Sequence, residues 1–139
     1  MMPTPKLEHF LLCEDIRTEA SQLCSVIGLF VAPLRLPGAG AIPQLTCGFV
    51  LRDMKGIAKI RSQIELQRPG EEPVTSYSTG SPQTWHKRDP EQDRHLHVHW
   101  FFPFAALSQG RHWFRAILEF DGADAVRAEA GLDVEFSAE

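Results

Sequence analysis

Residues 92–102 read Gln-Asp-Arg-His-Leu-His-Val-His-Trp-Phe-Phe, in which apolar and polar side chains alternate strictly. Side chains of a β-strand point alternately to opposite faces of the sheet. The pattern therefore predicts a half-buried strand whose inward face holds the even positions: Leu96, Val98, Trp100 and Phe102. The histidines at the odd positions, His95, His97 and His99, are expected to point toward solvent.

Weaker copies of this alternation predict further strands. Residues 45–52 and 57–67 are expected to pair as a hairpin around residues 53–56, where Gly56 can take the positive φ that a turn needs. Residues 112–120 predict another strand, with these side chains inward: Phe114, Ala116, Leu118 and Phe120. Val134 and Phe136 belong to a final strand.

Two apolar runs near the N-terminus, residues 10–13 and 23–31, predict an antiparallel pair covered on both faces, with a helix over residues 14–23 as the alternative. Residues 32–43 are rich in proline and glycine and are expected to form a loop. The long polar segment 68–94 predicts a second loop, with one short edge strand near residues 74–78.

About seven or eight short antiparallel strands, separated by turn signals, each bury one face. Two stacked sheets satisfy them all, so we expect one all-β domain over residues 1–139, an immunoglobulin-like antiparallel β-sandwich. A small barrel is the alternative.

Charge and composition limit the kinds of partner and the cellular compartment that we expect for this protein. The net charge is −4 and the basic residues are scattered, which argues against nucleic acid. No apolar run approaches the ~18 residues that cross a membrane, and the start lacks the pattern of a secretory signal. Cys13, Cys24 and Cys47 are odd in number, lack close spacing and are interpreted as buried thiols in a cytoplasmic protein.

The histidines are the candidates for metal chemistry. Neighbouring odd positions lie ~6.6 Å apart along a strand, so two imidazoles can reach one metal ion but three cannot. If residues 92–102 pair with residues 111–120, His95 lies opposite Glu119, which could be a third ligand. The metal hypothesis therefore names His95, His97 and Glu119, with His86 or His112 as alternatives, around zinc or another divalent transition metal.

The same pairing predicts a binding patch beside the histidines. It places Phe101 opposite Trp113, His99 opposite Arg115 and His97 opposite Ile117, which exposes these side chains: Phe101, Trp113, Arg115 and Ile117. Mixed aromatic, histidine and arginine surfaces are typical of protein interfaces. Trp85 either fixes the loop to the sandwich or holds a small apolar or sugar ligand beneath it.

Residues 14–17, Glu-Asp-Ile-Arg, with Glu19 nearby, are interpreted as a local ion pair that shapes a turn, because adjacent carboxylates on a strand point apart. Cys13 precedes this segment. This segment, followed by Ile-Gly-Leu-Phe at residues 27–30, resembles the start of a family of small bacterial β-sandwich proteins, a domain family of unknown function. Its N-terminal segment reads Cys-Glu-Asp-x-Arg-x-Glu. Residues 43–45 and 103–104 are similar to later segments of that family, so the likeness touches most of the chain. The resemblance implies no activity, cofactor or catalytic residue.

The expected function is a non-catalytic binding or assembly module without a cofactor, which recognises a protein partner or forms a homo-oligomer through an exposed sheet face. The alternative is a metal-binding protein, possibly a hydrolase, that uses the histidine strand. Exposed histidines would titrate near pH ~6.5, and an interface on their face would then weaken in acid.

Overall fold

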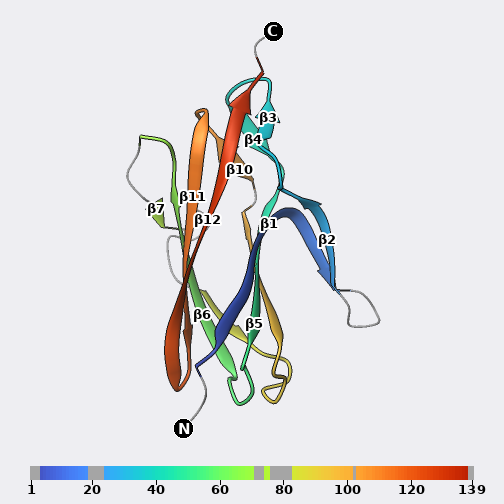
Figure 1. The fold of residues 1–139 in the computed structure, drawn as a ribbon, viewed down its shortest axis with the longest axis vertical. Helices are drawn as coiled ribbons and strands as arrows, with labels where there is room; N and C mark the ends of the chain where they lie inside the picture. The colour runs from blue at the N-terminus through green and yellow to red at the C-terminus, as the bar shows by residue number, and fades with distance from the viewer. Residues whose placement is uncertain (1–3, 19–23, 71–73, 76–82, 102, 138–139) are drawn as a thin grey trace.

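The chain folds into two facing β-sheets and a small third sheet, as a computed structural model shows (Figure 1). The structure describes residues 4–18, 24–70, 74–75, 83–101 and 103–137. Within these residues no helix occurs, and the predicted all-β sandwich is confirmed. Neighbouring strands are antiparallel except for the pair β3 and β12, which is parallel. Glu19 and Phe102 lie outside the described residues.

The first sheet, called sheet A, has the strand order β2-β1-β5-β9. Its strands are β1 (Lys6–Thr18), β2 (Cys24–Leu29), β5 (Leu45–Arg52) and β9 (His95–Phe101). The second sheet, called sheet B, has the order β3-β12-β11-β6-β7, and β8 also pairs with β6. Its strands are β3 (Leu34–Leu36), β6 (Lys59–Gln67), β7 (Val74–Thr75), β8 (Gln83–His86), β11 (Gly110–Phe120) and β12 (Ala123–Phe136). The strands β4 (Gly40–Ile42) and β10 (Phe104–Ala106) pair with each other.

The hydrophobic core lies between the inner faces of sheets A and B. Sheet B contributes alternate residues of β6 and β11, and the inward side chains predicted for β11 are confirmed. Sheet A contributes the odd positions of β5, which are fully buried: Leu45, Cys47, Phe49 and Leu51. The ring of Phe101 meets that of Phe114 across the interior at 5.6 Å between centroids.

The predicted hairpin of residues 45–52 and 57–67 is wrong, although both strands exist. β5 pairs with β1 and β9, whereas β6 pairs with β11, so the connection crosses from one sheet to the other. Met54 and Ile57 in this connection are fully buried. Their burial explains the crossing, because apolar side chains that enter the core draw the chain across the end of the sandwich.

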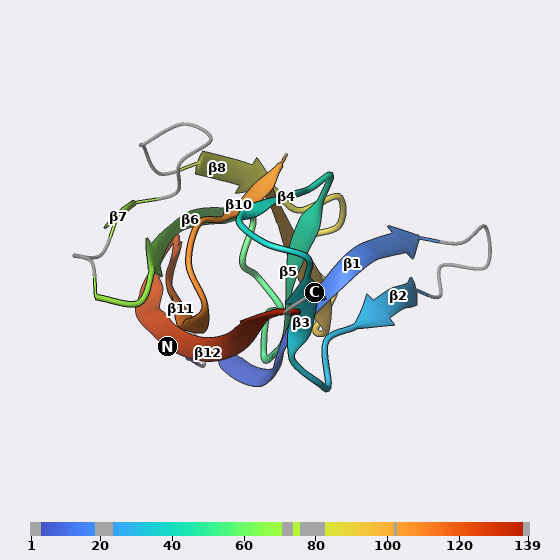
Figure 2. The ribbon, with the colours of Figure 1, turned by 90° about the horizontal axis from the view of Figure 1, so that it is seen from above.

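The predicted pairing of the two N-terminal runs is confirmed, because β1 and β2 are antiparallel neighbours and residues 14–18 are strand rather than helix. The expected cover on both faces is wrong for β2, where Val26 and Leu29 are 43% and 45% exposed. Figure 2 shows the reason, since the distal part of the β1–β2 pair projects from the body of the molecule. We call this part the arm. Cys24 at its distal end is exposed, against prediction, whereas Cys13 and Cys47 are buried thiols.

The predicted loop 68–94 contains β7, which matches the expected short edge strand, and β8, which the sequence analysis missed. After β8, Lys87 fixes the next connection. It is 7% exposed, and its ammonium donates to the carbonyl oxygens of Met54 at 2.7 Å, Gln92 at 2.8 Å and Pro90 at 3.3 Å. Burial lowers the pKa of Lys87, although nearby carboxylates oppose this shift.

Replacing Lys87 should therefore destabilise the protein without changing its fold. Lys87→Met keeps the aliphatic stem but leaves buried carbonyl oxygens without their donor, so we expect a loss of about 2–3 kcal/mol of unfolding free energy. Urea denaturation measures this loss. Lys59→Met, at an exposed position on β6, is the matched control and should change stability by less than about 0.5 kcal/mol. Equal effects of the two substitutions would contradict a stabilising role for Lys87.

Candidate functional site

The histidines of β9 point into the sandwich, opposite to the prediction. β9 pairs with β5 so that His97 lies opposite Phe49 and His99 opposite Cys47, both on the inner face. His97 and His99 are 3% and 2% exposed. The even positions do share one face, as predicted, but that face looks outward.

Phe101 explains this orientation. It is fully buried against Phe114, so the expectation that it is an exposed binding residue is wrong. Because side chains alternate along a strand, an inward Phe101 places the histidines at the other odd positions inward as well. Burying a neutral imidazole ring in this apolar interior costs far less free energy than burying a charged side chain would.

The histidine strand and β11 do not pair, so the predicted register between them is wrong. β11 lies between β6 and β12, and Glu119 is exposed opposite Arg61. His95 and His97 belong to sheet A and are not brought together with Glu119. The alternative ligands are also apart, with exposed His86 on β8 and buried His112 near the carbonyl oxygen of Gly110. Within the described ranges, no group of three His, Cys, Asp or Glu residues is placed to hold a metal ion.

Burial keeps the β9 imidazoles neutral. It lowers the pKa of His97 to about 3, helped by repulsion from His95 and His99. It lowers the pKa of His95 to about 4, with a further contribution from Lys87. Burial also lowers the pKa of His99. The expected titration near pH ~6.5 assumed exposed histidines, so it is wrong for these buried side chains.

Trp85 lies at the edge where β8 approaches β9. Its ring meets His97 edge-on at 5.5 Å between centroids and lies 6.2 Å from the ring of Trp100. It is half-buried within a strand that pairs with β6. These contacts match the interpretation of Trp85 as a side chain that fixes this segment to the sandwich. They also place an aromatic ring over the edge of the histidine cluster.

The outer face of sheet A carries apolar side chains from all four strands. Gly48 marks its centre, because a Cβ there would meet Ile16 Cδ1 at 2.4 Å, Leu96 Cδ1 at 3.7 Å and Leu11 Cβ at 3.8 Å. The register places Val50 beside Leu96, Val98 beside Gly48 and Val26 beside Ile16. We call this set the outer patch: Leu11, Ile16, Val26, Val50, Leu96 and Val98.

A groove of about 510 Å³ runs beside the outer patch. Its lining includes Leu96 and Val98 of β9 and Cys24 of β2. Arg88 and Asp89, in the connection that Lys87 fixes, also line it. The sequence already contained the signal for this face, since the same alternation that defines the histidines also defines Leu96 and Val98. The sequence pattern was interpreted with Leu96 and Val98 facing the core, whereas the histidine face is the buried one.

Trp113, Arg115 and Ile117 lie on the outer face of sheet B, as predicted from their alternation. They border a shallow groove of about 430 Å³ over β6, β11 and β12. The charges there are matched internally: Arg115 pairs with Glu129 at 2.7 Å and also contacts Gln67. The guanidinium groups of Arg111 and Arg115 lie over the Trp113 ring, at 4.8 and 5.8 Å from its centroid. A role for these residues in binding stays a prediction.

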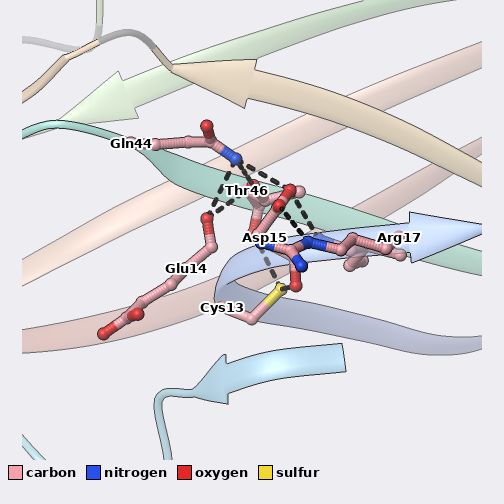
Figure 3. Close-up of polar contacts among 7 residues, drawn as sticks. Cys13, Glu14, Asp15, Arg17, Gln44 and Thr46 are labelled. Carbon is pink, nitrogen blue, oxygen red and sulfur yellow. Dashed lines mark hydrogen bonds and ion pairs between the residues drawn. The ribbon is translucent and has the colours of Figure 1, made fainter. Parts of the chain in front are cut away.

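A polar network fixes β1 to the start of β5 (Figure 3). Gln44 Nε2 donates to Asp15 Oδ1 at 2.9 Å and to the carbonyl oxygen of Glu14 at 3.1 Å, which the hydroxyl of Thr46 also reaches at 3.0 Å. Arg17 pairs with Asp15 at 3.3 Å, so the interpretation of a local ion pair is confirmed for these two residues. Gln44 was not predicted from the sequence, because its partners Glu14 and Asp15 lie about thirty residues earlier.

The network also sets the charge of its members. Partial burial acts to raise the pKa of Asp15, but hydrogen bonds from Arg17, Gln44 and the backbone NH of Ile16 outweigh it and lower the pKa. Burial raises the pKa of Cys13 to about 11, and the charge of Asp15 adds to this shift. At neutral pH the site therefore presents ionised Asp15 beside a protonated, unreactive thiol.

Comparisons with known proteins were made on the sequence and on the fold. No family model and no curated protein matches the chain. The fold is similar to the C-terminal domain of wzt, with a TM-score of 0.49 and 13% identity over 96% of this chain and 75% of that one. It is also similar to a β-glucosidase from Listeria innocua, with a TM-score of 0.41 and 11% identity, where it spans 94% of this chain but 16% of that one. Neither likeness says what this chain binds.

The described segments include no helix with the length and apolar character needed to cross a membrane.

The buried histidines should make the protein sensitive to acid. Because the folded state disfavours protonation, the unfolded state binds more protons as the pH falls below about 6.5. The free energy of unfolding is therefore highest above that pH and falls as the pH is lowered. The fall continues to about pH 4 for His95 and to about pH 3 for His97, which are the pKa values of these side chains in the folded state. Each such histidine contributes a slope of up to about 1.4 kcal/mol per pH unit.

Urea denaturation at a series of pH values between 7.5 and 4.5 measures this slope. His97→Phe should make the curve shallower by close to one proton. A wild-type stability that stays flat down to pH 4.5 would show that the imidazoles are solvated.

Proposed function

We propose that this chain is a non-catalytic binding and assembly module that recognises a protein surface through the outer patch of sheet A. The occupant that we favour is a second copy of the chain. The main support for the proposal is the orientation of β9. Its alternating sequence predicts that the apolar face is buried, but in the folded chain this face lies on the outside of sheet A. Exposed contiguous apolar surface rimmed by polar residues is typical of protein interaction sites.

The composition of the outer patch supports self-association. All six of its side chains are uncharged, and no charged residue occurs between Cys24 and Phe30 in the neighbouring strand and its end. Two such faces can meet about a twofold axis without bringing like charges together. Face-to-face packing of two sheets would bury Leu96 and Val98 as their alternation predicts.

The outer face of sheet B is the less suitable face for this role. Arg111 and Arg115 already have acidic, amide or aromatic partners within the sheet, so docking there would require these groups to exchange partners. The outer patch has no such interactions to lose. Covering it removes apolar surface from water, which is the main favourable term in most protein association.

Introducing a charge into the outer patch should therefore weaken the dimer. We expect wild-type protein to show a monomer–dimer equilibrium in sedimentation velocity over a concentration series. Val98→Lys places an unpaired charge in the interface and should weaken association at least about thirtyfold, for a cost of about 2 kcal/mol or more. Circular dichroism should show the same β-structure in both proteins.

Ile117→Lys is the matched control, because it makes the same kind of change on the outer face of sheet B. It should leave the equilibrium unchanged. A wild-type protein that is monomeric throughout the concentration series would overturn self-association. Equal weakening by both substitutions would show that the outer patch is not the interface.

A further inference from the structure

A second cavity, of about 370 Å³, opens beside the base of the arm. Three segments far apart in the sequence form it: the part of β1 around Glu14, the chain from β2 to β3 around Phe30, and Gln44 before β5. One wall is polar and the other is apolar. Ligand sites typically combine an apolar surface with a few fixed polar groups in this way.

The polar wall is held rigidly by the network shown in Figure 3. Asp15 accepts hydrogen bonds from Gln44 Nε2 and the backbone NH of Ile16, both at 2.9 Å, and pairs with Arg17. The only guanidinium of this wall is therefore engaged with a carboxylate that belongs to the same wall. Two carboxylates against one guanidinium leave the wall with a net negative charge.

Glu14 supplies the unmatched charge. Among the described residues its carboxylate has no hydrogen-bond or ion-pair partner, and Figure 3 shows it directed away from Gln44 and Thr46. It lies across Gly28, where an added Cβ would come within 2.6 Å of Glu14 Cδ. Gly28 also has a φ of +64°, which favours glycine. This glycine therefore leaves room for the carboxylate over β2.

The apolar wall is part of the rim of the core. Phe30, Leu34 and Ile42 are partly buried and pack against the core cluster, so their positions are fixed by the interior. A ligand that fits both walls needs an aliphatic stem to cover the apolar side chains and a cation to reach the carboxylate. Long amphipathic cations bury their methylene stems along apolar surface in just this manner.

We propose that this cavity binds an alkylammonium group, either the side chain of a lysine in a polypeptide or one end of a free polyamine. The methylene chain lies against Phe30 and Leu34, and the ammonium donates to the Glu14 carboxylate. The site is separate from the outer patch and does not depend on self-association.

Titration followed by NMR tests the proposal with defined probes. Nα-acetyl-lysine methylamide represents the polypeptide source and cadaverine the free polyamine, and Nα-acetyl-norleucine methylamide keeps the stem without the charge. We expect at least one of the two cationic probes to shift the backbone amide signals of Glu14, Ile27 and Phe30. The norleucine probe should bind at least tenfold more weakly.

Two variants locate the site. Glu14→Gln should weaken binding of the cationic probe at least tenfold while preserving the amide spectrum elsewhere. Glu119→Gln, at an exposed carboxylate on sheet B, should leave binding unchanged. Binding of the lysine probe but not cadaverine identifies a polypeptide source, and the reverse identifies a free polyamine.

Three results would overturn the alkylammonium site: no shift with either cation, equal binding of the norleucine probe, or equal loss in Glu14→Gln and Glu119→Gln. Sedimentation velocity of the same samples keeps this test distinct from the proposed dimer. If the protein is monomeric but still binds the cation, the proposed dimer is wrong and the alkylammonium site stands.

Discussion

The pairing of β9 with β5 is the constraint on which the other features of the molecule depend. Phe101 lies opposite Leu45 in that register and meets Phe114 of the facing sheet, which anchors the odd positions of β9 inside. The two-residue period of a strand then places His97 in the core and Val98 outside. The neutral imidazoles, the outer patch and the groove beside it are all consequences of this one register.

The sequence predicted which residues share a face much better than it predicted which face is buried. Alternation along residues 95–101 and 112–120 correctly grouped the side chains, because the period is a local property of the strand. The choice of the inward face depends on the neighbouring strand and on the opposite sheet, which the sequence alone does not specify. Histidine made that choice harder, since it resembles a polar surface residue in a pattern but is tolerated in the core as a neutral ring.

The missed parts of the candidate sites share a physical cause. Lys87 and Gln44 act on main-chain carbonyl groups, at Met54 and Glu14, about thirty residues distant. Any residue type can supply a carbonyl oxygen, so no residue pattern reveals such a partner. The predicted hairpin failed for a related reason: Met54 was interpreted as part of a turn and Ile57 as the start of the returning strand, whereas their burial at the end of the sandwich takes the chain into the other sheet.

The bend of β1 links the two surfaces proposed for recognition. Asp15 is held to Gln44, which leads directly into β5, so the position of the arm is set by a strand at the centre of sheet A. The residue before Asp15 lines the cavity, and the residue after it lays its side chain over Gly48 in the outer patch. A Cβ at position 28 would come within 2.6 Å of Glu14 Cδ, and one at position 48 within 2.4 Å of Ile16 Cδ1, so glycine leaves room for these two side chains. One short stretch of β1 thus builds a charged surface and an apolar surface on the same rigid hydrogen-bonded support.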